Sequence, residues 1–169
     1  MKRISVLVLV AFVLVLTGFK SDSRKEKKAK QQLEMAQLIQ SGRFRFVARS
    51  AHSELGNFDQ LSSNYDLVFD SLQVKAFLPY YGRAYSVPLG GSGGVKFDLT
   101  AKSIDRKWNE KKKLFLISTE LADSQDSYSI YLTASLDGFA DLNINFRNRR
   151  LISYYGTIEK IELKSTKGK

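Results

Sequence analysis

The chain has 169 residues, a length that supports one domain and little more. It holds no cysteine and a single histidine, which excludes a disulfide framework, a thiolate nucleophile and a metal site built from several histidines of one chain. Hydrophobic residues make up 43% of the chain, with only 11 Gly and 2 Pro, so the composition argues against wholesale disorder.

The formal net charge of +10 is concentrated at the two ends of the chain. Residues 1–30 carry eight Lys and Arg against two acidic residues, and the tail 164–169 carries three lysines. Residues 31–163 are nearly neutral, with sixteen basic and fifteen acidic residues. A nucleic-acid-binding fold usually carries its basic excess on the folded domain, where it meets phosphates. We therefore expect no nucleic-acid partner.

Residues 1–19 predict a signal peptide or a membrane tether. Lys2 and Arg3 precede Ile4–Leu16, a run made almost purely of Val, Leu, Ile, Ala and Phe. A basic start followed by such a run is typical of a secretory signal, and the run is short for a bilayer span, which needs ~20 apolar residues. We expect export to the periplasm or to a membrane-associated cell envelope, with this segment making the membrane contact.

The end of the apolar run resembles a bacterial lipoprotein box. Leu16-Thr17-Gly18 would come just before a lipidated cysteine, but Phe19 stands at that position. Because phenylalanine has no thiol, a thioether lipid anchor cannot form on the sequence as it stands. Three interpretations remain open: an uncleaved tether, inefficient cleavage, or a departure from a lipoprotein ancestor.

Residues 20–42 are predicted to form a charged linker and a helix. Lys20–Lys30 is charge-rich without apolar periodicity, as in a solvated spacer. From about Lys25 to Ser41 the composition favours a helix, and Gly42 is a plausible C-cap. We expect its narrow apolar stripe to dock on the sheet. The stripe consists of Leu33, Met35, Ala36, Leu38 and Ile39.

Residues 43–163 are predicted to form an antiparallel β domain, followed by the basic tail 164–169. Past Gly42 the hydrophobic period changes from helical to alternating, which indicates strands with one apolar face. The eight expected strands are Arg43–His52, Tyr65–Asp70, Leu72–Leu78, Val95–Lys102, Leu114–Leu121, Tyr128–Leu136, Ala140–Phe146 and Leu151–Ile158. Asp137-Gly138 between two of them predicts a hairpin with a type I′ turn.

The strand pattern sets the fold class. The connections leave no room for the crossover helices that a parallel sheet needs. A sheet with one apolar face must close on itself or pack against another layer. We therefore expect a mainly β fold, an antiparallel meander of about eight strands that forms a barrel or a two-layer sandwich, with one N-terminal helix.

Two segments resemble a known family. Leu78–Tyr85 (LPYYGRAY) and the SYYGTI run within Ile152–Ile158, with the Gly138 hairpin between them, are similar to small exported Bacteroidetes proteins that contain a domain of unknown function. The resemblance covers roughly residues 43–160. It implies a mostly β fold in a cell-envelope protein, often a lipoprotein. It supplies no assigned activity, so no catalytic residue can be carried over.

The candidate ligand-binding residues come from the same two segments. Tyr80-Tyr81-Gly82 and Tyr154-Tyr155-Gly156 echo each other, and both are expected at strand ends. Tyrosine and arginine suit recognition because each offers a flat apolar body with a polar tip. The alternative is structural: the rings close one end of the sheet, and the two glycines allow bends or bulges. The candidates are Tyr80, Tyr81, Arg83, Tyr85, Tyr154 and Tyr155.

Other motifs favour a structural interpretation. Gly90–Gly94 is followed by Val95 instead of the Lys-Ser/Thr of a phosphate loop, so we expect a loop able to act as a flap. The turn that holds Asp123 and Asp126 is predicted to be solvated rather than a calcium site. Trp108 is expected to pack over a sheet edge.

Charged side chains give no catalytic constellation. The stripe of Arg43, Arg45 and Arg49 is expected to pair with acidic residues on adjacent strands rather than with an anionic ligand. His52 is a weak catalytic candidate because no nucleophile or orienting acid is visible beside it. Several carboxylates are available for glycosidase chemistry, but nothing in the sequence singles out a pair. They are Asp66, Asp70, Asp98, Asp105 and Glu120.

These observations favour a non-catalytic, exported cell-envelope β domain that binds a small apolar or amphipathic ligand or a protein partner. We expect no catalytic residue, no metal and no cofactor. Two alternatives stay open: a carboxylate-dependent hydrolase of envelope or dietary polymers, and a purely structural envelope component.

Overall fold

The computed structural model describes residues 23–53, 56, 58–61, 65–81, 94–124 and 126–161. The chain divides into two compact units, Met1–Glu34 and Met35–Lys169. Within the described part, no helix has both the length and the apolar character needed to cross a bilayer. The predicted signal or tether (1–19) and the basic tail (164–169) lie outside the described residues.

A helix covers residues 23–41, close to the predicted span. It ends at Gly42, which has a φ of +70° and donates its N–H to the Ile39 carbonyl (3.2 Å), so the predicted C-cap is confirmed. Ile39 is fully buried. Three further stripe residues pack against the core: Met35, Ala36 and Leu38. Leu33 is 60% exposed, so the prediction that the whole stripe docks is wrong there, because the helix residues that pack against the core begin at Met35.

Ten antiparallel strands form one sheet, which confirms the mainly β prediction. They are β1 (Arg43–Ser53), β2 (Phe58–Gln60), β3 (Asp66–Asp70), β4 (Gln73–Pro79), β5 (Gly94–Thr100), β6 (Asp105–Asn109), β7 (Leu114–Ala122), β8 (Ser127–Ser135), β9 (Phe139–Phe146) and β10 (Ile152–Glu159). Each of the eight predicted strands is present. The additional strands are β2, with three residues, and β6, whose sequence DRKWN is mostly polar, so neither shows a recognisable apolar alternation.

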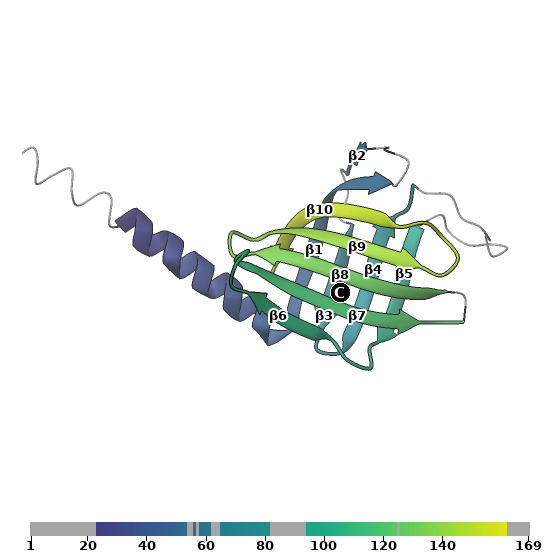
Figure 1. Cartoon of the computed structure of the whole chain (residues 1–169), viewed down its shortest axis with the longest axis horizontal. Coiled ribbons are helices and arrows are strands. Elements are labelled where there is room, and N and C mark those ends of the chain that lie inside the picture. The colour runs from purple at the N-terminus through teal and green to yellow at the C-terminus, as the bar shows by residue number, and fades with distance from the viewer. Residues whose placement is uncertain are drawn as a thin grey trace, which may run out of the picture. The chain divides into compact units, whose positions relative to one another are not determined.

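The strand order is β5-β4-β3-β1-β10-β9-β8-β7-β6, and β2 pairs with β1 beside this path. The sheet therefore consists of two runs of hairpins, β3 to β5 and β6 to β10, joined through β1. Figure 1 shows β7 to β10 lying in front of β1, β3, β4 and β5 and crossing them. One continuous sheet thus curls into a half-barrel whose two halves face each other. The fold is therefore closer to the predicted barrel than to a sandwich of two separate sheets.

The apolar faces of the two halves form the core between them. Within the strands, buried residues alternate with exposed or half-buried ones, as in β4 and β9. Aromatic rings from different strands pack there, for example Phe44 on Phe69 with centroids 5.0 Å apart. The largest fully buried side chains include Tyr154, Phe44, Phe46, Phe69, Ile39, Leu67, Leu78, Ile117, Ile130, Leu132, Leu142 and Ile144.

The connection 101–104 brings the two ends of the sheet together. It joins β5, at one end of the strand order, directly to β6, at the other. The hydroxyl of Thr119 on β7 donates a hydrogen bond to the Ser103 carbonyl (2.7 Å), and the Ala101 N–H donates to the Leu72 carbonyl (2.8 Å). We call this place, defined by residues 101–104 and the facing part of β7, the seam.

A β-bulge bends the middle of the sheet, as predicted for Gly156. The register of β1 against β10 shifts between Ala48 and Ser50, and Gly156 is the partner of Ala48. A side chain at position 156 would collide with the Val47 carbonyl and the Phe46 ring, so only glycine fits.

The hairpin at Asp137-Gly138 is present, but its turn is not the predicted type I′. Gly138 has a φ of +87°, whereas Asp137 is not among the residues with positive φ. The Gly138 N–H donates to the Ser135 carbonyl (3.1 Å), which makes a three-residue loop with glycine in the left-handed position. The connection therefore has one residue more than a type I′ hairpin.

Candidate functional site

Two of the predicted tyrosines connect strands at one end of the half-barrel. Tyr154 on β10 faces inward and is 1% exposed, and its hydroxyl donates to the Pro79 carbonyl at the end of β4 (2.6 Å). Burial raises the pKa of the Tyr154 phenol far above its usual value. Tyr80 is half-buried and donates its hydroxyl to the Arg150 carbonyl (3.1 Å). Both phenols are therefore engaged by the backbone of neighbouring segments.

Asp126 is buried and paired, so the prediction of a solvated turn is wrong for this residue. Its Oδ1 accepts hydrogen bonds from the backbone N–H groups of Ser127, Arg147 and Asn148 (2.9, 3.1 and 3.3 Å). Its Oδ2 accepts from Nε of Arg149 (3.3 Å). The connection between β9 and β10 folds back over the turn between β7 and β8, and this contact removes the carboxylate from water.

Aromatic rings surround the Arg149 guanidinium, which lies 5.2 Å from the Tyr80 ring centroid and 4.6 Å from that of Phe146. Phe146 meets Tyr80 and Tyr128 edge-on. Burial, assisted by a hydrogen bond to Asp123, raises the pKa of Tyr128 to about 12. Arg149 also donates Nη1 to the Gly94 carbonyl (3.1 Å). We call Tyr80, Asp126, Tyr128, Phe146 and Arg149 the Arg149 cluster; it closes this end of the half-barrel.

The predicted patch of four tyrosines does not assemble. Tyr154 and Tyr155 are consecutive in β10 and so face opposite sides of the sheet. Tyr155 is 41% exposed on the outer face, nearly parallel to Phe139 with ring centroids 6.0 Å apart. Tyr81 is equally exposed, and burial and the nearby Asp59 raise its pKa.

Two predicted ligand residues, Arg83 and Tyr85, lie outside the described residues, as does most of the Gly90–Gly94 loop. His52 is exposed, with its ring 4.8 Å from that of Phe58. Within the described ranges, no group of three or more His, Asp or Glu residues could hold a metal ion.

The arginine stripe pairs with acidic side chains, as predicted. Arg43 contacts Asp70 on β3 (2.8 Å), and Arg45 and Arg49 both contact Glu159 on β10 (2.8 and 3.3 Å). The hydrogen bond from Arg45 lowers the pKa of Glu159. All three arginines of the stripe are therefore paired with acidic side chains.

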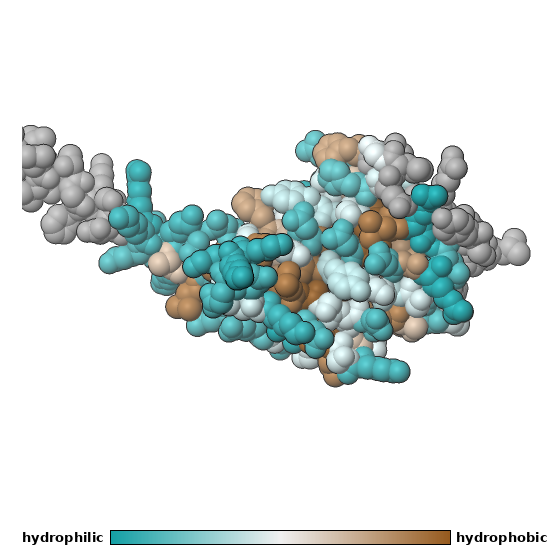
Figure 2. Space-filling view, viewed as in Figure 1, coloured by the Kyte–Doolittle hydropathy of each residue, from teal (hydrophilic) through white to brown (hydrophobic). Residues whose placement is uncertain are grey.

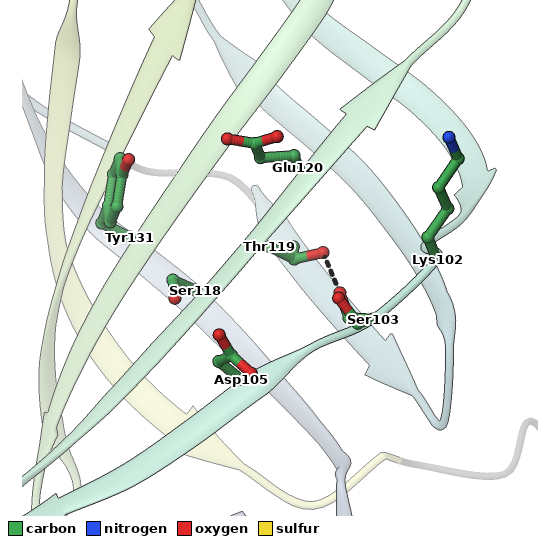
Figure 3. Close-up of a pocket in the computed structure, with 7 residues that line it drawn as sticks. All are labelled: Lys102, Ser103, Asp105, Ser118, Thr119, Glu120 and Tyr131. Atoms are coloured by element: carbon green, nitrogen blue, oxygen red, sulfur yellow. Dashed lines mark hydrogen bonds between the residues drawn. The ribbon is translucent and has the colours of Figure 1, made fainter.

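A pocket of about 290 Å³ lies on the outer face at the seam (Figure 3). Elements that are distant in the strand order contribute to it, because the connection after β5 meets β7 and β8 there. It is lined by Lys102, Ser103, Asp105, Ser118, Thr119, Glu120 and Tyr131.

Strand register places the pocket side chains. Asp105 on β6 pairs with Ser118 on β7, which pairs with Tyr131 on β8, so the three form an outward row across the strands. Glu120 follows Ser118 by two residues and faces the same side. Thr119 points inward, and Figure 3 shows its hydroxyl holding the Ser103 backbone at the pocket wall.

Three polar side chains of this pocket are not used by the fold. Some acidic side chains elsewhere are paired, as in Asp98 with Lys75 (2.7 Å). Among the described residues, the side chains of Asp105, Glu120 and Tyr131 make no hydrogen bond, ion pair or ring contact. Tyr131 is 48% exposed. Two carboxylates and a phenol ring are thus available to a ligand at one place.

The sequence reasoning missed this pocket as a site. It named Asp105 and Glu120 among five carboxylates but could not join them, because β6 and its register with β7 were not predicted. The available signal was Tyr131, an aromatic residue on the outward side of β8, where its neighbours on that face are Ser129 and Thr133.

A family model described as a domain of unknown function (DUF4251) matches residues 26–158. The chain belongs to the DUF4251 family. A crystal structure of a DUF4251 family protein from Bacteroides eggerthii is similar, with a TM-score of 0.62 and 19% sequence identity over 78% of this chain and 89% of that one. At this identity the likeness shows the fold alone. No curated protein matches the chain. The domain of unknown function is confirmed, and the Bacteroides relative agrees with the expected Bacteroidetes origin.

Proposed function

We propose that this DUF4251 chain is an exported, non-catalytic cell-envelope domain that binds a small amphipathic ligand in the seam pocket. The observation that carries the proposal is the convergence of Asp105, Glu120 and Tyr131 on one cavity without any role in the fold. Ligand sites are concave and combine an apolar surface with a few convergent polar groups. Tyr131 offers the apolar surface, and the two carboxylates offer the polar groups.

The candidate tyrosines are weaker support for a ligand site than the pocket. Tyr80 and Tyr154 each donate their hydroxyl to a backbone carbonyl. The Arg149 cluster occupies the end of the half-barrel where those rings lie. A ligand there would have to displace contacts that hold strands together, whereas a ligand in the seam pocket displaces only water.

Binding is tested by titrating the ¹⁵N-labelled chain with small-molecule extract from the envelope of its own cells. We expect amide shifts confined to the pocket residues and their neighbours, and weaker shifts in a chain with Tyr131→Ala. Phe77→Ala is the control, since it removes an exposed aromatic ring that does not line the pocket. Unchanged pocket signals, or equal effects of the two variants, would contradict a ligand role and favour a purely structural domain.

Export rests on the basic start and apolar run of residues 1–19. Cell fractionation with an antibody to the domain tests it. We expect the protein in the periplasmic or membrane fraction. Recovery of the intact 19.2 kDa chain in the cytosol would overturn this part of the proposal.

A hydrolase is the second candidate, because Asp105 and Glu120 line the same pocket. Glycoside hydrolysis requires two carboxylates on opposite sides of the scissile bond. We favour binding because both residues are exposed on an outer face, whereas active sites usually exclude water. Turnover of glycoside substrates that is lost in both Asp105→Asn and Glu120→Gln would establish the hydrolase instead.

A protein partner is the third candidate, and the ring pair of Phe139 and Tyr155 favours it. Both side chains are substantially exposed on the outer face of β9 and β10. Figure 2 shows that hydrophobic side chains interrupt a mostly hydrophilic surface over β7 to β10. A partner bound there would be released by Phe139→Ser but not by Tyr131→Ala.

A further inference from the structure

The chemistry of the seam pocket points to a neutral sugar, and we propose that the pocket binds one pyranose ring. This inference rests on the proposed function, since it names the ligand class of the same site. The pocket offers the two kinds of group that sugars need: a flat aromatic face and hydrogen-bonding side chains beside it.

The aromatic face comes from Tyr131. Its ring is 48% exposed and, among the described residues, has no ring partner. One face of a pyranose presents C–H groups, which pack against the electron-rich face of an aromatic ring. A sugar that covers Tyr131 would remove apolar surface from water without requiring any change in the fold.

The hydrogen-bonding groups come from the walls on either side. The carboxylates of Asp105 and Glu120 accept hydrogen bonds from hydroxyls, and bonds to an ionised acceptor are stronger than those between neutral groups. Lys102 and the Ser118 hydroxyl supply donors. Figure 3 shows the two carboxylates and the Tyr131 ring on different sides of Ser118. A pyranose placed over Ser118 would therefore lie between the carboxylates and the aromatic ring.

The mixture of charges disfavours the other ligand classes. An anion would face two carboxylates, and a cation would face Lys102 in the wall. Specialised cation sites surround the charge with several aromatic rings, whereas Tyr131 is the one aromatic residue among the described residues that line this pocket. A neutral polyhydroxylated ligand uses both donors and acceptors and leaves no buried charge unpaired.

The size of the pocket fits a single ring, and the same face offers a second contact. A volume of about 290 Å³ is at the lower end of the range for ligand pockets, roughly 300–1,000 Å³. Tyr155 lies two strands from Tyr131 and two residues along, because Tyr131 pairs with Asn143 and Tyr155 with Asp141. From strand geometry this is about 12 Å. An oligosaccharide with one ring on Tyr131 would therefore extend toward Tyr155.

The test titrates the full chain, by amide NMR, with glucose, galactose and N-acetylglucosamine and with their β-linked tetrasaccharides. Spermidine serves as the cationic probe. We expect at least one sugar to shift the amides of the pocket residues, and Tyr131→Ala and the double variant Asp105→Asn/Glu120→Gln each to weaken its binding at least tenfold. Tyr155→Ala is expected to weaken only the tetrasaccharide.

Controls separate the two proposals. Glu110→Gln removes an exposed carboxylate that does not line the pocket and should leave sugar binding unchanged. Pocket shifts with spermidine and none with any sugar would overturn the sugar assignment but support a ligand role for the pocket. Shifts with neither probe would overturn the sugar assignment, and if the envelope extract also fails, the proposed function falls as well. Unchanged melting temperatures show that the variants are folded.

Discussion

Arg149 has a different kind of contact on each side of its guanidinium. It pairs with Asp126, donates to the Gly94 carbonyl and packs against two aromatic rings. An arginine suits this position because its planar group can stack and donate at the same time. This one side chain therefore connects the ends of β4 and β9 with the starts of β5 and β8.

Replacing Arg149 with Met is expected to lower the free energy of unfolding by about 3 kcal/mol, because it leaves the buried Asp126 carboxylate without its cation. Urea denaturation measures the loss. The control is Arg43→Met, which breaks an exposed pair with Asp70 and should cost under about 1 kcal/mol. Equal losses in the two variants would contradict the structural importance of the buried pair.

Tyr128 predicts a dependence of stability on alkaline pH. Its pKa is raised from 10.0 to about 12 in the folded chain. A phenol with a higher pKa when folded stabilises the fold below pH 10 and loses that contribution as the pH rises through 12. We expect this group to account for a loss on the order of 2 kcal/mol over that interval. In Tyr128→Phe the alkaline fall in stability should be smaller than in the unmodified chain, and identical profiles for the two chains would disprove the assignment.

The helix shows the difference between local and tertiary signals at the element scale. Its composition and the cap at Gly42 indicate where it ends, and the structure agrees. Which of its apolar residues are buried depends on the sheet. Ile39 is fully buried, while Leu33 on the same predicted stripe is exposed. Periodicity identifies a face but not the length over which that face is covered.

Truncating Ile39 and Leu33, two aliphatic residues of the stripe, should therefore lower stability by unequal amounts. Ile39→Ala removes buried methyl groups and leaves a cavity, at a cost of about 2–5 kcal/mol. Leu33→Ala changes an exposed position and should stay within about 0.5 kcal/mol. Thermal melting of the two variants compares them directly. A Leu33 variant as unstable as the Ile39 variant would show that the stripe is buried along its whole length.

At the scale of the whole molecule, the seam determines how the half-barrel is held together. The chain passes from one end of the sheet to the other through residues 101–104, and Thr119 bonds to this connection instead of another strand. The same crossing creates the pocket, because it brings Lys102 and Ser103 beside the outward row that contains Tyr131. The candidate site therefore exists because the two ends of the sheet come together at the seam.

Thr119→Val tests the seam while keeping the shape of the side chain. It removes the hydrogen bond to the Ser103 carbonyl in a buried position, which should cost about 1–2 kcal/mol. Hydrogen exchange at the Ala101 amide, which donates to the Leu72 carbonyl, should accelerate. Thr133→Val, on the outer face of β8, is the matched control. Equal exchange in both variants would show that the Thr119 bond does not hold the connection.

Local sequence information was enough to predict eight of the ten strands of the described residues, the helix end, the bulge opposite Gly156 and the pairing of the arginine stripe. These features depend on alternation, on capping or on charges that face each other across neighbouring strands. The type I′ prediction at Asp137 was wrong because the strands pair with a three-residue loop between them instead of a two-residue one. The prediction missed β6 because its sequence DRKWN is mostly polar and shows no apolar alternation.

What the sequence alone determined is the kind of chain this is: a strand-rich domain with one apolar face per strand, because side-chain alternation is a property of each strand by itself. Only the tertiary structure decided which polar side chains pair with each other within the fold and which remain available to a ligand. Asp126 and Arg149 pair because two turns fold together, and Asp105 lies in the pocket with Tyr131 because three strands align. Such contacts between distant segments depend on the register and curvature of the whole sheet, which short stretches of sequence do not encode.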